Sequence, residues 1–149
     1  MATKEVTVRL MRHEDKDALV EIDSLSSGEP RAEYLMGKFK QALSSEHTMV
    51  ASLVAETEDK VVGFLMGEVY MGEFGVPEGV ATVNTVGVHP SAQGMGVGRK
   101  LMEAFLAHLR EAGVERVRTV VSWDQWDLMG YFRANGYTPG TSIVLERDV

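Results

Sequence analysis

The sequence predicts a mixed α/β fold in which helices flank a central sheet. Three observations predict this class: runs of β-forming residues recur along the chain, amphipathic helical patterns separate them, and glycine or proline ends most segments. The expected element order is β-α-α-β-β-β-α-β-α-β. The 149 residues, 44% of them hydrophobic, show no internal repeat or linker and predict one domain over residues 1–149.

The first third of the chain predicts one strand and two helices. Residues 6–11 alternate apolar and polar side chains, which is the period of a half-buried strand. Residues 14–27 begin with acidic residues and continue with a helical apolar pattern that ends before Gly28. After Pro30, apolar residues recur at three and four positions to about residue 44, which indicates a second amphipathic helix.

The middle of the chain predicts three strands and a helix. Residues 49–55 and 61–71 flank a polar link and predict a hairpin, and glycines within the second run indicate bends or close backbone approaches. Residues 80–88 are nearly continuous in β-forming residues and predict a central strand that ends before Pro90. Residues 96–112 have one apolar face and predict a helix.

Three shorter elements are predicted in the last third. Residues 117–122 predict a buried strand, and residues 124–135 predict a short helix that ends at Gly136. Residues 141–145 predict a last strand.

Composition excludes several classes of function. The net charge of -7 and a pI near 5.1 argue against nucleic-acid or anionic-membrane partners and suit a cationic or amine partner. The absence of cysteine excludes disulfides and a catalytic thiol, and the four scattered histidines predict no metal site. With no signal-peptide pattern and no apolar run of about 18 residues, we expect a cytoplasmic protein without a membrane span.

The strongest chemical signal is a glycine-dense segment between the predicted strand 80–88 and the helix after it. Its amide N–H groups, with those of the helix N-terminus, would fit a pyrophosphate, and Arg99 and Lys100 could add charge at its rim. A P-loop would need serine or threonine where Leu101 stands, and a dinucleotide fingerprint would lie at the first βα turn. The pattern [Gln/Arg]-x-x-Gly-x-[Gly/Ala] matches at every fixed position of the segment Gln93-Gly94-Met95-Gly96-Val97-Gly98.

This segment resembles the acetyl-CoA motif of the GNAT superfamily of N-acetyltransferases, in which the pattern follows a strand that ends in Val-x-Pro. Further similar segments occur in the family's order at residues 8–19, 61–64, 86–90 and 131–137. The resemblance implies a mostly antiparallel sheet that splays open in the middle, and transfer of acetyl from acetyl-CoA to a primary amine. It also implies that the pantetheine arm contacts the main chain of Val86 and Val88, that the Val88 N–H stabilises the oxyanion, and that residues 93–98 hold the pyrophosphate.

The reaction needs a general base or a water chain, because the attacking amine must lose a proton and alkyl ammonium groups have a pKa near 10. Many family members carry a glutamate on the fourth strand, where this sequence has Thr82 and Asn84. Glu68 is the candidate base, and Glu29, Glu73 or a water relay are the alternatives.

The general acid also departs from the family pattern. Many members protonate the leaving thiolate with a tyrosine four residues before a glycine, and Phe132 occupies that position here. Tyr131, about 100° round the helix, is the candidate acid, with a packed core aromatic as the alternative. Coenzyme A is a fair leaving group, so the reaction does not require a tyrosine.

Three functions stay open at this point. The first is an acetyltransferase for a small-molecule or protein amine, with acetyl-CoA as co-substrate, no metal, and a homodimer as an open option. The second is an acyl-CoA-binding sensor that has lost the chemistry, as Thr82, Asn84 and Phe132 would allow. The third is the same fold acting on another short acyl-CoA.

Overall fold

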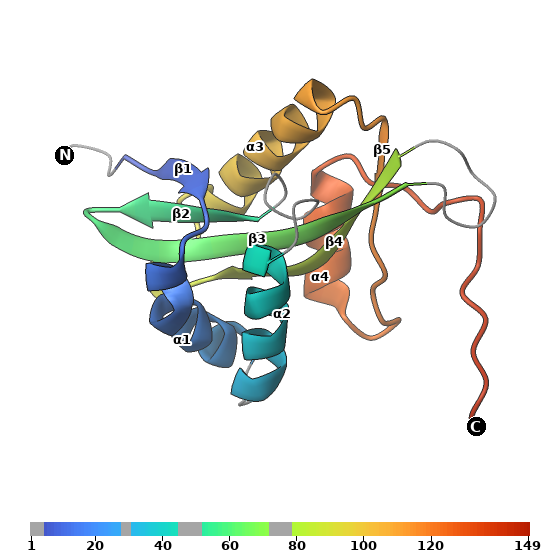
Figure 1. Cartoon of the computed structure of the whole chain (residues 1–149), viewed down its shortest axis with the longest axis horizontal. Coiled ribbons are helices and arrows are strands. Elements are labelled where there is room, and N and C mark those ends of the chain that lie inside the picture. Colours follow the sequence, from blue (N-terminus) through green and yellow to red (C-terminus); the bar gives the residue numbers. More distant parts are fainter. Residues whose placement is uncertain (1–4, 28–30, 45–51, 72–78) are drawn as a thin grey trace. The chain divides into compact units, whose positions relative to one another are not determined.

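The computed structural model describes residues 5–27, 31–44, 52–71 and 79–149 (Figure 1). Its contacts divide the chain into two units, Met1–Thr119 and Val120–Val149. The elements of the first unit are β1 (Thr7–Leu10), α1 (Lys16–Ser27), α2 (Ala32–Ser44), β2 (Leu53–Thr57), β3 (Lys60–Met71), β4 (Gly79–Val88), α3 (Val97–Glu111) and β5 (Arg116–Arg118). The second unit contains α4 (Trp126–Ala134).

The first unit is built on a five-stranded sheet in the order β1-β2-β3-β4-β5. The strands from β1 to β4 pair antiparallel, whereas β5 runs parallel to β4 and contacts it only at Val80–Thr82. The prediction of a mixed, mostly antiparallel sheet is therefore confirmed. Figure 1 shows α1 and α2 on one side of this sheet and α3 on the other.

Both faces of the sheet are covered by apolar side chains from these helices. The cluster on the α1 and α2 side consists of Met11, Leu19, Ile22, Leu35, Phe39, Val54, Phe64 and Met66. On the other side, Leu101 and Phe105 of α3 are fully buried. Truncating such a leucine to alanine typically costs about 2–5 kcal/mol, so these contacts fix the helices against the sheet.

Two glycines of β3 allow α3 to pack close to the sheet. A Cβ atom at Gly63 would lie 2.7 Å from Cγ1 of Val97, and one at Gly67 would lie 2.8 Å from Cε2 of Phe105. Neither distance is tolerable for a real side chain, so the predicted close backbone approach is confirmed. It fixes the N-terminus of α3, where the glycine-dense segment ends.

The predicted hairpin is formed by β2 and β3, with a shorter turn than expected. Its two central residues, Glu58 and Asp59, have φ angles of 51° and 62°. Positive φ at both central positions defines a type I′ turn, whose twist matches that of paired strands. The predicted start of the first strand at residues 49–51 lies outside the described residues.

The two strands predicted in the last third are wrong in part. β5 has three residues instead of the predicted 117–122, and its exposed Arg116 and Arg118 leave only Val117 half-buried. Residues 141–145 form no strand: Ile143, Val144 and Leu145 are exposed by 83%, 62% and 85%. A run of β-forming residues expresses a weak local preference, and a strand also needs a paired neighbour.

Candidate active site

At the end of β4, the main-chain groups of Val86 and Val88 face away from the partner strand β3. The N–H of His89 donates to the carbonyl of Val62 at 2.7 Å, which fixes the phase of the ladder between these strands. The N–H and C=O groups of successive residues point to opposite sides of a strand. Since those of His89 point to β3, those of Val88 and Val86 point to the other side, where β5 pairs. The pairing with β5 stops at Thr82. The described strands therefore leave those main-chain groups without a ladder partner.

A bulge separates the two halves of β4. Thr85 and Val83 face Met66 and Gly67, which are adjacent in β3, so Asn84 is the extra residue. Bulges bend a strand and increase its twist, and they are frequent beside active sites. The extra residue lies two positions after Thr82, the last residue paired with β5, which fits the predicted splay.

The glycine-dense segment forms the turn between β4 and α3. Gly94 and Gly96 have φ angles of 84° and 75°, in the left-handed region that glycine adopts without strain. The first bond within α3 runs from the N–H of Lys100 to the carbonyl of Gly96, at 3.0 Å. The N–H groups that precede this bond belong to the positive end of the helix dipole, which favours an anion.

The side chains around this turn leave room in front of it. A Cβ atom at Gly94 would meet no other atom within 4 Å, and one at Gly96 would approach only the end of the Arg99 side chain, at 3.8 Å. Arg99 is exposed, and its Nε lies 3.8 Å from Oε1 of Glu103. Lys100 instead donates from Nζ to the carbonyl of Val6 at 3.3 Å. Val97 is buried, so only its main chain is available to a ligand.

Glu68 is a buried carboxylate on β3. Its side chain accepts a hydrogen bond from the hydroxyl of Tyr70, two residues along the strand. Across the ladder it faces Thr82, one of the two positions where the family carries its glutamate. Tyr70 was not among the predicted site residues, although the strand period of two places it on the face of Glu68. The alternatives Glu29 and Glu73 lie outside the described residues.

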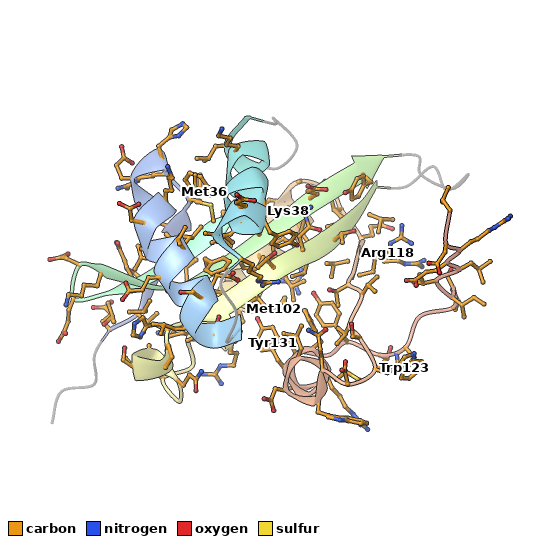
Figure 2. All side chains as sticks on the ribbon, turned by 90° about the horizontal axis from the view of Figure 1, so that it is seen from below. Met36, Lys38, Met102, Arg118, Trp123 and Tyr131 are labelled. Carbon is orange, nitrogen blue, oxygen red and sulfur yellow. The ribbon has the colours of Figure 1, made fainter. Side chains whose placement is uncertain are left out.

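In the second unit, Tyr131 and Phe132 occupy different environments on α4. Phe132 is buried, with its ring centroid 5.2 Å from that of Tyr131 and 5.0 Å from that of Tyr137. Tyr131, labelled in Figure 2, is half-buried. Burial raises the pKa of Tyr131 above its ordinary value and raises the pKa of Tyr137 to about 12. The catalytic role of Tyr131 stays a prediction.

Across the described ranges, no three histidine, aspartate or glutamate side chains gather closely enough to hold a metal ion. Nor does any helix in this part of the chain have the length and apolar character needed to cross a bilayer.

Residues 16–137 match the acetyltransferase (GNAT) family, and the chain belongs to that family. Members of the family are acyl-CoA-dependent N-acetyltransferases. The mycothiol acetyltransferase of Geodermatophilus obscurus is 39% identical over 62 residues, which cover 42% of this chain and 20% of that protein. That of Thermobispora bispora is 33% identical over 94 residues, which cover 63% and 32%. The chain thus spans a third or less of these relatives.

Solved structures show the same fold at low sequence identity. An aminoglycoside N-acetyltransferase in complex with CoA has a TM-score of 0.78 and 17% identity, over 97% of this chain and 95% of that one. The ribosomal-protein-S18-alanine N-acetyltransferase of Escherichia coli has a TM-score of 0.74 and 18% identity, over 92% and 80%. A transcriptional regulator from Bacillus halodurans has a TM-score of 0.78 and 17% identity, over 97% and 100%.

Proposed function

We propose that this chain transfers the acetyl group of acetyl-CoA to a primary amine. One observation carries the proposal: β4 ends with the main chain of Val86 and Val88 turned away from β3, and the left-handed turn at Gly94 and Gly96 then opens α3. The extended pantetheine arm can form hydrogen bonds with the main chain of Val86 and Val88, as a paired strand would. A pyrophosphate can bind to the N–H groups of the turn and of the N-terminus of α3. The CoA complex of a structural neighbour supports this donor.

The residues of the chain divide the chemistry among them. Glu68 takes a proton from the ammonium of the acceptor, so that the amine nitrogen can attack the thioester carbonyl carbon. The N–H of Val88 stabilises the oxyanion that forms with the new C–N bond. Tyr131 donates a proton to the sulfur as the C–S bond breaks. The ammonium loses two protons and the sulfur gains one, so one proton reaches the solvent in each turnover.

Substitutions in the turn test the donor site. Gly96→Glu and Gly98→Glu are expected to weaken acetyl-CoA binding at least about 100-fold, because a side chain and a negative charge enter the pyrophosphate position. Isothermal titration calorimetry measures the affinity, and circular dichroism confirms folding. Gly113→Glu is the matched control for Gly96→Glu, since Gly113 also has a left-handed φ, of 78°, but follows the opposite end of α3. Unchanged affinity in folded turn variants would refute the donor site.

A sensor that binds acyl-CoA without turnover is the second candidate function. Thr82 and Asn84 replace the family glutamate and Phe132 replaces the tyrosine, and one structural neighbour is a transcriptional regulator. Tight acetyl-CoA binding without thiol release across a panel of amines would favour the sensor. Comparing acetyl, propionyl and succinyl donors in the same assay would identify the acyl group.

The type of amine acceptor, the cellular location and the partners of the chain are also proposals. The structural neighbours include enzymes for aminoglycosides and for the alanine of ribosomal protein S18, so both small-molecule and protein amines fit the family. We propose a cytoplasmic protein without nucleic-acid or membrane partners, on the basis of its net charge of -7. Analytical ultracentrifugation tests whether it forms a homodimer.

A further inference from the structure

Three acidic side chains are buried among the described residues, and they differ in their partners. Asp15 is held by the guanidinium of Arg9 at 2.7 and 2.9 Å. Asp23 is held in the same two-pronged way by Arg31, at 2.8 and 2.9 Å. Glu68, the third, accepts a hydrogen bond from the phenol of Tyr70 and has no basic side chain within ion-pair distance in the described ranges.

The sequence next to this carboxylate offers no cation either. Residues 72–78, which connect β3 to β4, contain two glutamates and no lysine, arginine or histidine. A buried carboxylate without a cation is costly, and one neutral hydrogen bond offsets only part of that cost. Two of the three buried acids have an internal cation, so the cation for Glu68 is expected to come from a ligand.

The geometry around Glu68 shows how a ligand could reach it. Glu68 faces the last β4 residue that pairs with β5, just before the bulge at Asn84. Tyr70 is 37% exposed, so its ring extends from the buried carboxylate to the protein surface. Its bond occupies Oε2 of Glu68, which leaves Oε1 as the oxygen that can meet a positively charged group.

We propose that Glu68 and Tyr70 form the acceptor subsite, that this subsite takes alkyl ammonium groups, and that Tyr70 is the positioning residue that orients Glu68. The inference rests on the proposed acetyltransferase function and adds to it the positioning residue Tyr70 and a preference for charged alkyl ammonium acceptors over uncharged aryl amines. The ammonium pairs with Oε1 of Glu68 and gives that oxygen one proton, which then passes to water. An arylamine is uncharged at neutral pH, so it needs no anionic partner and no deprotonation before it attacks. The one proton that its nitrogen loses afterwards balances the proton that the leaving sulfur gains.

Acceptors that differ in charge test the proposal in one assay of thiol release. Benzylamine, hexylamine and spermidine are the ammonium acceptors, and aniline is the uncharged counterpart of benzylamine. Glu68→Gln is expected to lower kcat/KM for the ammonium acceptors by about 100- to 1000-fold, as loss of a general base does, and to change that for aniline less than about twofold. Acetyl-CoA affinity should stay constant.

The role of Tyr70 is tested by Tyr70→Phe and by the double variant with Glu68→Gln. Tyr70→Phe should lower kcat/KM for the ammonium acceptors about tenfold and leave the rate with aniline unchanged. Because Tyr70 acts through Glu68, the double variant should be no worse than Glu68→Gln alone, which a double-mutant cycle measures. Glu111→Gln, an exposed acid on α3, is the matched control and should behave as the wild type.

Several outcomes would overturn the proposal, and they differ from failure of the proposed function. Equal losses with aniline and benzylamine, additive effects in the double variant, or a silent Glu68→Gln each refute the subsite while acetyl transfer stands. Absence of turnover with every amine, in wild-type protein that binds acetyl-CoA, refutes the acetyltransferase function and the subsite with it.

Discussion

At the scale of single residues, Asp15 links the first strand to the first helix through charge. Besides the two bonds from Arg9, its carboxylate accepts the N–H of Arg12 at 2.7 Å. Burial raises the pKa of Asp15, but these hydrogen bonds outweigh burial and hold the pKa below its ordinary value of 3.8. A carboxylate with a lowered pKa stabilises the fold above its ordinary pKa and loses that contribution as the pH falls through the folded value.

The lowered pKa of Asp15 predicts that its contribution to stability depends on pH. Asp15→Asn is expected to lower the free energy of unfolding by about 2–3 kcal/mol at pH 7, because Arg9 loses its more buried charged partner and keeps only Glu56, whose Oε2 lies 3.2 Å from Nε of Arg9. The difference from wild type should begin to shrink below about pH 4, where Asp15 of the unfolded chain becomes protonated, and should be lost as the pH falls through the lower pKa of the folded protein. Urea denaturation at several pH values measures it. Asp17→Asn, an exposed acid nearby, is the control, and a difference that does not vary with pH would contradict the assignment.

At the scale of elements, the proposed role of Tyr131 as the general acid depends on which side of α4 is directed to the thioester sulfur. Tyr131→Phe is expected to lower the turnover number about ten- to a thousandfold with little change in acetyl-CoA affinity, and Phe132→Tyr should give no gain. The opposite pattern, with Tyr131→Phe silent and Phe132→Tyr faster, would show that Phe132 faces the sulfur. Silence of both would exclude a tyrosine acid.

The elements also show what the sequence alone could predict. The helices at Ala32–Ser44 and Val97–Glu111 were predicted closely because amphipathic periodicity is a local property. The turn at residues 93–96 was predictable for the same reason, since glycine permits its positive φ angles. The strand at residues 141–145 was wrong, because local preference does not supply a pairing partner. The bond between Tyr70 and Glu68 depends on side-chain packing, which periodicity does not encode.

At the scale of the whole molecule, charge governs how the acceptor approaches. The chain carries 22 acidic and 15 basic residues, and one of these acids is the buried carboxylate of the proposed subsite, Glu68. Such a protein should attract ammonium acceptors at long range and repel the anionic donor. The attraction between exposed charges is screened over about 10 Å at 0.1 M salt and over about 3 Å at 1 M.

Salt should therefore change the KM for a charged acceptor and leave the KM for an uncharged acceptor constant. Between about 0.05 and 0.5 M sodium chloride, the KM for spermidine is expected to rise several-fold, because screening removes the long-range attraction for a multiply charged cation. The KM for aniline should stay constant, since an uncharged acceptor does not respond to the field. Steady-state kinetics at saturating acetyl-CoA measure both values under the same conditions, so changes in protein stability would affect both acceptors alike. A flat KM for spermidine would mean that the negative charge of the chain lies away from the acceptor, and would leave the short-range contact with Glu68 as the sole source of cation preference.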